Sequence, residues 1–230
     1  MVQKKNSIVI VDYGMGNLKN VQNAFKAIGH DSEISSDYKE IKNATHLVLP
    51  GVGGFKDAMK TLSGLNLVNP LKDHISMGKP FLGVCLGMQL LFESSEEFGH
   101  HEGLGILKGK VVRFDEGIVP LIPHIGWNNV RISRKIKAGE NATEHNGVQR
   151  DSGRLAPFKG IKNGSFFYFL HSFYCVPSED ITVATCEYYH EFTACIKKGS
   201  IFACQFHPEK SHNAGLKMLY NFAFGTGEQI

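Results

Sequence analysis

The first ninety residues alternate short apolar segments with helical patterns, and this alternation constrains the fold more than any other feature of the sequence. Apolar runs with the length of buried strands occupy residues 7–13, 45–51 and 79–84. Helical patterns separate them, at residues 18–28, 38–43 and 66–77. This rhythm predicts βαβ units, and therefore a parallel sheet flanked by helices.

The second half of the chain differs, because its apolar runs follow one another without helices between them. They occupy residues 109–114, 165–174, 182–189, 192–198 and 200–206, and a last helical pattern covers residues 211–223. We expect these runs to add antiparallel or mixed strands to the sheet. The sequence therefore predicts an α/β fold with a mostly parallel central sheet and antiparallel strands added in the C-terminal half.

Length and composition favour a single domain over residues 1–230, since 230 residues with 42% hydrophobic content can bury a sizeable core. Residues 134–165 stand apart as a polar, glycine-rich stretch. We expect a mobile surface excursion there.

Charge and hydropathy argue against several classes of partner. The formal net charge is only +3 and the basic residues are scattered, so we expect no binding to nucleic acid or to an anionic membrane. No run approaches the roughly 18 apolar residues of a membrane-spanning helix, and the N-terminal run is too short for a signal peptide. We expect a soluble, cytoplasmic protein.

The five cysteines give no sign of a disulfide framework or a structural zinc site. They stand at positions 85, 175, 186, 195 and 204, an odd number without a C-x-x-C pair. The last three are nine residues apart, a regularity that would also suit a metal site. Each of them lies in an apolar run, however, and packing within a strand explains it better. We expect no metal and no cofactor.

Cys85 lies in the pattern G-x-C-x-G, between an apolar run and the helical pattern MQLLFESSEE. Serine in this pattern forms the nucleophile elbow, a strained strand-to-helix turn that the flanking glycines allow. A helix N-terminus favours the attacking thiolate, and the NH of Leu86 would face a developing oxyanion. A buried structural cysteine between two packing glycines also explains the pattern. Only a base elsewhere in the sequence can decide between a reactive and a structural Cys85.

The motif F-H-P-E near the C-terminus supplies a base and a carboxylate. His207 falls at the end of the apolar run 200–206, and Glu209 lies just beyond it. A cysteine nucleophile needs a base within hydrogen-bond reach, and the base benefits from a carboxylate that fixes its tautomer. His207 and Glu209 fit these roles. Among the other histidines, His124 and His171 border apolar segments and are kept as candidates for binding.

Residues 50–54, with the sequence PGVGG, close the second apolar run and open a helix. A glycine-rich turn at this place can cradle phosphate, but the GK[ST] ending of a P-loop and the full G-x-G-x-x-G pattern are both missing. Backbone NH groups of this turn would instead join the NH of Leu86 in an oxyanion hole, the two-donor arrangement of acyl transfer.

Together, the segments PGVGGF, GVCLGMQLLFE and QFHPEKS resemble the class I, triad-type glutamine amidotransferases, and they occur in that family's order. Four more segments, IVDYGMGNLKNV, SSEEFGHHEGLGIL, PHIGWN and YFLHSFY, are similar to the glutaminase subunits of imidazole glycerol phosphate synthases. The resemblance covers nearly the whole chain. It implies the class I glutamine amidotransferase fold.

By this resemblance, Cys85 attacks the side-chain amide of glutamine, His207 passes a proton to the departing ammonia, and Glu209 orients His207. The thioester then hydrolyses to glutamate. The NH groups of Gly53 and Leu86 stabilise the oxyanion, after a rearrangement of the glycine-rich turn that a partner triggers. Glutamine binding is implied for Gly51, Val52, Gln89, Glu97 and the segment His171, Ser172 and Phe173. Gln89 and Glu97 would lie one and three helical turns beyond the nucleophile.

The resemblance also implies a heterodimer with a (β/α)8 cyclase subunit. That subunit receives the ammonia internally and makes imidazole glycerol phosphate and aminoimidazole carboxamide ribonucleotide in histidine biosynthesis. Asn17 and Trp127 match positions near the interface, although burial in the core also explains a tryptophan.

Three other functions stay open from the sequence. A related glutaminase that feeds a sugar-modifying amidotransferase shares the triad. A catalytically silent subunit would keep the fold, although the intact triad argues against it. A protease or esterase would use the same three residue types, and triad spacing alone does not exclude it.

Overall fold

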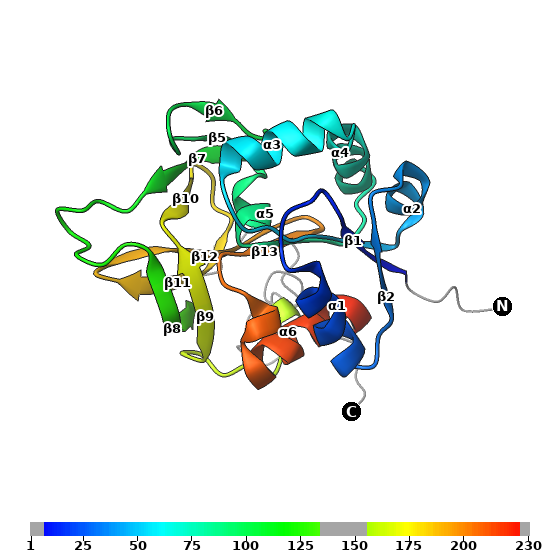
Figure 1. Cartoon of the computed structure of the whole chain (residues 1–230). Helices are drawn as coiled ribbons and strands as arrows, with labels where there is room; N and C mark the ends of the chain where they lie inside the picture. Colours follow the sequence, from blue (N-terminus) through cyan, green and yellow to red (C-terminus); the bar gives the residue numbers. More distant parts are fainter. Residues whose placement is uncertain (1–6, 134–155, 226–230) are drawn as a thin grey trace.

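The computed structural model describes residues 7–133 and 156–225, and a nine-stranded sheet runs through its centre (Figure 1). The strand order is β2-β1-β3-β4-β13-β12-β11-β8-β9. The strands are β1 (Ile8–Val11), β2 (Ser32–Ser35), β3 (His46–Leu49), β4 (Phe81–Val84), β8 (His124–Ile132), β9 (Phe166–His171), β11 (Thr182–Tyr188), β12 (His190–Lys198) and β13 (Ile201–Cys204). Pairings from β2 to β13 are parallel, and pairings from β13 to β9 are antiparallel. The predicted α/β fold is confirmed, and its two halves meet at β13.

Helices cover both faces of the parallel half because its strands are apolar on both sides. Ile8 and Ile10 of β1 share an apolar cluster with residues of α1 and α6, whereas Val9 and Val11 share a second cluster with residues of α2, α3 and α4. The helices are α1 (Leu18–Ala27), α2 (Tyr38–Asn43), α3 (Phe55–Gly64), α4 (Val68–Ser76) and α6 (His212–Phe224). All four side chains of β1 are buried, as continuous apolar strands of parallel sheets usually are.

A second, four-stranded sheet lies beside the first, in the order β10-β7-β5-β6. Its strands are β5 (Phe92–Ser95), β6 (His101–Glu102), β7 (Leu107–Arg113) and β10 (Phe173–Pro177). The apolar run 165–174 therefore divides at Ser172, with β9 in the large sheet and β10 in the small one. The expectation that every late run extends one sheet was wrong for β7 and β10. Val111 and Cys175 of these strands instead pack in the second apolar cluster, above the turn at Cys85.

The helix predicted after Cys85 is correct only for its first turn. Helix α5 (Leu86–Gln89) has four residues, and the chain enters strand β5 at Phe92. Phe92 is fully buried in the second apolar cluster, and its strand pairs with β7. Tertiary packing has overridden the helix propensity of this segment.

The predicted surface excursion over residues 134–165 divides into two parts. Residues 134–155 lie outside the described residues. The segment that follows forms a short 3-10 helix, η1 (Ala156–Phe158), in which Phe158 is buried and packs edge-on against Phe202. Asn221 donates to the carbonyls of Pro157 and Lys159. This segment therefore begins in the core at Phe158, whereas Lys159, Gly160 and residues 162–164 are exposed. The surface excursion and a single domain over residues 1–230 stay predictions.

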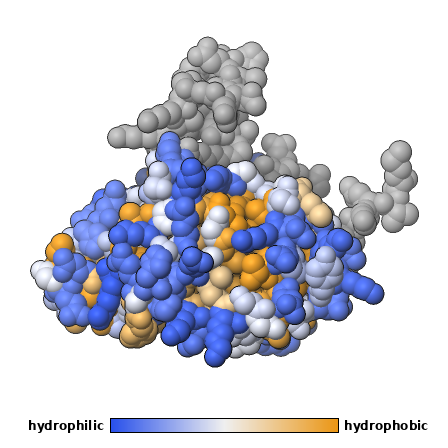
Figure 2. Space-filling view, turned by 90° about the horizontal axis from the view of Figure 1, so that it is seen from above, coloured by the Kyte–Doolittle hydropathy of each residue, from blue (hydrophilic) through white to orange (hydrophobic). Residues whose placement is uncertain are grey.

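Figure 2 shows one face of the molecule, seen from above the view of Figure 1, with apolar surface near the centre and hydrophilic residues around it. Among the described residues, exposed large apolar side chains include Phe98, Leu121 and Ile125. No described helix has the length and apolar character needed to cross a membrane.

Candidate active site

The turn at Cys85 has a strained backbone that its glycine neighbours make possible. Cys85 joins β4 to α5 with φ of 53° and ψ of −110°, a left-handed φ that residues with a Cβ rarely adopt. A Cβ added at Gly87 would lie 1.8 Å from the carbonyl oxygen of Leu49, and one added at Gly83 would lie 2.9 Å from the carbonyl oxygen of Gly87. The two flanks accept only glycine, and the chain makes the turn that the G-x-C-x-G pattern predicts.

Three segments meet at one edge of the sheet because β3, β4 and β13 are neighbouring parallel strands. In the register of β4 and β13, Val84 pairs with Cys204. The segments that follow these strands are residues 50–54, Cys85 and residues 205–209, and they emerge side by side at the carboxyl edge. This edge is where open α/β sheets place their sites.

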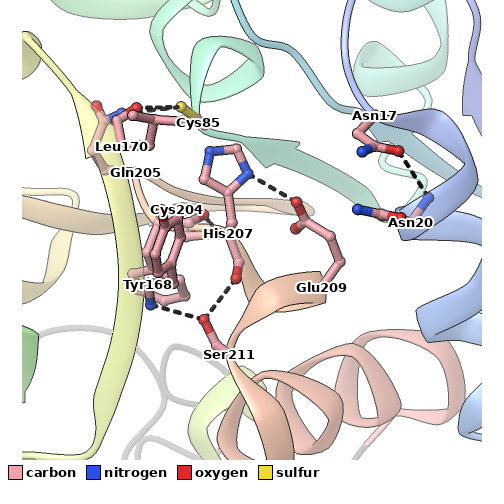
Figure 3. A network of polar contacts seen from close by, with 11 residues as sticks. Asn17, Asn20, Cys85, Tyr168, Leu170, Cys204, Gln205, His207, Glu209 and Ser211 are labelled. Atoms are coloured by element: carbon pink, nitrogen blue, oxygen red, sulfur yellow. Dashed lines mark hydrogen bonds and ion pairs between the residues drawn. The ribbon is translucent and has the colours of Figure 1, made fainter. Parts of the chain in front are cut away.

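His207 lies between Cys85 and Glu209 (Figure 3). Its Nδ1 donates to Oε1 of Glu209 at 2.8 Å, and its other ring nitrogen faces the sulfur of Cys85. The side chains of all three residues are buried. Burial alone lowers the pKa of His207, but the Cys85 sulfur and the Glu209 carboxylate together raise it to about 10. The imidazole of His207 is therefore protonated at neutral pH, between the sulfur and the carboxylate.

The backbone of His207 is fixed from two sides (Figure 3). Its NH donates to the carbonyl of Tyr168 on β9 at 2.9 Å, and its carbonyl accepts from the hydroxyl of Ser211 at 2.6 Å. That hydroxyl oxygen also accepts from the NH of Tyr168 at 3.0 Å. The antiparallel half thus positions a histidine that the parallel half brings to the edge.

The glycine-rich turn after β3 is anchored at one end and open at the other. The hydroxyl of Tyr13 donates to the carbonyl of Pro50 at 2.8 Å, and burial raises the pKa of Tyr13, which keeps the hydroxyl protonated as a donor. A Cβ added at Gly51 would lie 2.4 Å from the Tyr13 oxygen, so this position accepts only glycine. Gly53 has φ of 106°, and an added Cβ would meet nothing within 4 Å. Gly53 thus has a backbone conformation that favours glycine and faces open space on its Cβ side.

A cavity of about 620 Å³ opens beside Cys85, between the two sheets. The predicted site residues that line it are Val52, Gly53, Cys85, Leu86, Gln89, Glu97, His171, Ser172 and Phe173. Residues that line it without having been predicted are Glu96, Phe98, Gly99, Arg113, Pro123 and Leu170. Gly51 lies outside this cavity and lines a smaller one, of about 20 Å³, together with Asn17, His207 and Glu209.

Gln89 and Glu97 reach the cavity by different routes. Gln89 is the last residue of α5, one turn beyond Cys85 as predicted, and it is buried. Glu97 follows strand β5, and its carboxylate accepts from the NH of Phe55 at the start of α3. Its predicted helical spacing was wrong, although its side chain lines the cavity.

His124 and His171 form a buried hydrogen-bonded pair next to the cavity. Nδ1 of His124 lies 3.1 Å from Nε2 of His171, and Nδ1 of His171 lies 2.9 Å from the carbonyl oxygen of Phe173. Burial lowers the pKa of His124 to about 4 and that of His171 to about 3. Each ring is therefore neutral and has one NH donor. Because Nδ1 of His171 faces a carbonyl oxygen, this nitrogen carries the hydrogen, and Nε2 accepts from Nδ1 of His124.

The two residues predicted near an interface both reach the surface. Asn17 is exposed and caps α1, its side-chain oxygen accepting from the NH of Asn20. Trp127 on β8 is 44% exposed and stacks on His212 with ring centroids 4.8 Å apart. Burial in the core is therefore excluded for Trp127.

The other four cysteines are buried in strands, as was predicted for Cys186, Cys195 and Cys204. They are Cys175 in β10, Cys186 in β11, Cys195 in β12 and Cys204 in β13, and all are free thiols. Burial raises the pKa of Cys186 to about 12. No group of three or more potential metal ligands comes together in the part of the chain that the structure describes.

Fold and site together define the class. The family model described as class-I glutamine amidotransferase matches residues 9–226, so the chain belongs to that family. Solved structures with the same fold include a glutamine amidotransferase, with a TM-score of 0.68 and 15% identity over 94% of this chain and 98% of that one. The structure of PurLQS from Thermotoga maritima has a TM-score of 0.65 and 16% identity, over 95% and 97% of the two chains.

Much closer sequence relatives narrow the assignment. The imidazole glycerol phosphate synthase subunit HisH of Caldanaerobacter subterraneus is 49% identical over 97% of this chain and 98% of its own length. The HisH subunit of Aquifex aeolicus is 46% identical over 93% and 94%. Within its class, the chain belongs to the HisH glutaminase subunits of imidazole glycerol phosphate synthase, which confirms the resemblance seen in the sequence.

Sequence reasoning missed Gln205, a buried residue whose side-chain nitrogen lies 3.6 Å from the Cys85 sulfur. The motif QFHPE was interpreted only through its histidine and glutamate. Val84 pairs with Cys204 in strands β4 and β13, and Cys85 and Gln205 are the next residues in each strand's direction. This pairing would have indicated the contact between them.

Proposed function

We propose that this chain hydrolyses glutamine to glutamate and ammonia and supplies the ammonia to the cyclase subunit of an imidazole glycerol phosphate synthase, in histidine biosynthesis. The observation that carries the proposal is the buried set of Cys85, His207 and Glu209 beside a cavity of about 620 Å³. A nucleophile, a base beside it and a carboxylate hydrogen-bonded to the base are the parts that a thiol amidase needs.

In the proposed mechanism, the Cys85 sulfur attacks the side-chain carbonyl carbon of glutamine. His207 gives its proton to the amide nitrogen, ammonia departs, and a thioester remains. His207 then takes a proton from water, which attacks the thioester and releases glutamate. Glu209 keeps Nδ1 of His207 protonated through the 2.8 Å hydrogen bond, so that Nε2 exchanges the proton in both steps.

Two backbone NH groups are proposed to stabilise the tetrahedral oxyanion, one from Leu86 and one from Gly53. Both residues line the cavity beside Cys85. The open space around Gly53 supports the proposal that its peptide reorients when a partner docks, while Tyr13 holds the start of the turn. Two donors placed for the developing charge are worth several kcal/mol in related acyl transfers.

The cavity wall is proposed to bind the amino-acid end of glutamine. Glu97 offers a carboxylate to the substrate's ammonium group, and Gln89 offers its side-chain oxygen. Backbone groups of His171, Ser172 and Phe173 complete the wall from the antiparallel half. Gly51 and Val52 are proposed to contribute from the glycine-rich turn, Gly51 through the shape of its backbone.

The proposed partner is a (β/α)8 cyclase subunit in a heterodimer. Exposed apolar side chains on the segment up to and including Trp127 support a protein interface there, with Ile118 54%, Leu121 66% and Ile125 57% exposed. The ring of Trp127 stacks on His212, directly after the residue that holds the His207 backbone. Docking at Trp127 would thus act close to the base.

Ammonia release tests the proposal. Glutamine is supplied to the chain alone, to the chain with the cyclase, and to the complex with a ligand in the cyclase site. We expect slow release alone and a large increase in the complex, with no release from Cys85→Ser. Fast release without a partner, or none in the complex, would contradict it.

Copurification separates the remaining candidates. A cyclase bound to the native chain supports the proposal, whereas a sugar-modifying subunit would support the related glutaminase. A diazo ketone analogue of glutamine should label Cys85 in the complex. A catalytically silent subunit would stay unlabelled, and an esterase or protease would cleave its own substrates without glutamine.

A further inference from the structure

The nucleophile receives less help from its helix than the sequence indicated. Helix α5 has four residues, so its dipole is small, because the dipole grows with the number of aligned peptide groups. The sulfur of Cys85 lies 3.8 Å from the carbonyl oxygen of Leu170, an acceptor that disfavours a thiolate. His207 is one group that offsets this. A second donor lies directly after the neighbouring strand β13.

That donor is the side-chain amide of Gln205, whose Nε2 lies 3.6 Å from the Cys85 sulfur. Gln205 has no exposed surface and its backbone is held in the sheet, where its NH donates to the carbonyl of Ala194 at 2.8 Å. Strand pairing fixes the contact, because β4 and β13 place the two residues at matching positions after their last paired residues.

Gln89 determines which end of the Gln205 amide faces the sulfur. Nε2 of Gln89 donates to the carbonyl of Phe173 at 3.0 Å and to Oε1 of Gln205 at 3.0 Å. An inverted Gln205 amide would set two NH2 groups against each other and turn an oxygen toward the sulfur. The carbonyl of Phe173 requires a donor from Gln89, so both amides have one consistent orientation.

The geometry points to Gln205 as an amide donor that holds the Cys85 sulfur and favours its thiolate, with Gln89 as the positioning residue that orients Gln205. This inference rests on the proposed role of Cys85 as nucleophile. Hydrogen bonds to charged acceptors are about twice as strong as neutral ones, so the donor favours the thiolate over the thiol. It also keeps the sulfur in one place while the substrate enters.

The test measures how the alkylation of Cys85 by iodoacetamide depends on pH, with the modified peptide quantified by mass spectrometry. Gln205→Met keeps the volume and removes the donor. Gln205→Glu keeps the shape and adds a negative charge beside the sulfur. The matched control is Asn221→Leu, which removes another buried amide, on α6 and outside the residues that line the cavity. The full-length chain is used throughout.

We expect Gln205→Met to slow alkylation at neutral pH about tenfold and to move its midpoint up by about one pH unit, the scale of one charge-assisted hydrogen bond. Gln205→Glu should move the midpoint further. Asn221→Leu should lower the melting temperature and leave the midpoint unchanged. In the complex with the cyclase, kcat for glutamine should fall in Gln205→Met more than KM rises.

An unchanged midpoint in Gln205→Met, in a chain that still melts cooperatively, would overturn the inference. So would an equal shift in Asn221→Leu, because the effect would then report general loosening. Failure of the proposed function is distinguishable, since the native complex would then release no ammonia from glutamine whatever the alkylation profile.

Discussion

The two halves of the nine-stranded sheet contribute different things to the site. The parallel half supplies Cys85, His207, Glu209 and the glycine-rich turn, all at the ends of neighbouring strands. The antiparallel half and the small sheet supply the far wall of the cavity, with His171, Phe173 and Arg113, and the exposed apolar surface around Trp127. The groups proposed to react therefore lie where strand pairing fixes them, and the surfaces proposed for recognition lie where the chain changes sheet or meets solvent.

This difference also separates what the sequence predicts from what it does not. Cys85 and His207 each follow a short apolar run, and neighbouring parallel strands bring their carboxyl ends together. The local sequence pattern was therefore enough to predict that these two residues meet. The run 165–174 divides at Ser172 without a glycine or proline to mark the break, and its two parts join different sheets. Glu97 was misplaced because burial of Phe92 outweighed helix propensity.

The largest effect should come from the nucleophile. Cys85→Ser should reduce glutamine hydrolysis in the complex at least roughly a thousandfold, because no other group forms the thioester. A cysteine of the antiparallel half gives the matched control, since Cys186→Ala should keep most of the activity. Ammonia release measures both. If Cys85→Ser retained activity within a few fold of the native complex, Cys85 would not be the nucleophile and the parallel half would not supply the reacting group.

Glu209→Gln should lower kcat about a hundredfold, within the range for general acid–base catalysis. Glu209 helps raise the pKa of His207 to about 10, so the variant should lose activity at lower pH on the alkaline side. The same raised pKa stabilises the fold fully below pH 6.5, the ordinary value, and this stability is lost as the pH rises through about 10. Activity and melting profiles against pH check both; identical profiles in the variant would contradict the assignment.

Trp127→Ala should weaken binding of the cyclase about tenfold, as loss of an exposed aromatic anchor does at interfaces. Unstimulated glutaminase activity should change little. Tyr38→Ala is the control on the parallel half, since Tyr38 is 47% exposed on α2. Titration calorimetry with the cyclase measures the affinities. An equal loss of affinity in the two variants would contradict the assignment of the cyclase interface to the surface around Trp127.

The smallest effect concerns the histidine pair beside the cavity. Burial lowers the pKa of His124 to about 4 and of His171 to about 3, so unfolding takes up protons between these values and about 6.5. Stability should therefore fall as the pH drops from about 6.5 toward about 4. His124→Phe, which keeps the stack on Tyr188, should lose stability less steeply over that window. Urea unfolding at several pH values measures the slope, and an unchanged slope would exclude His124 as a cause.

The position of β13 has a consequence for how the protein is made. It is the last strand of the described chain to leave the ribosome, yet it lies between β4 and β12 in the middle of the sheet. A nascent chain that ends before β13 carries Cys85 without His207 and Glu209, and it leaves β4 with an open edge. If Cys85, His207 and Glu209 act as proposed, a partial chain lacks the groups that complete the triad until the segment after β13 has been made.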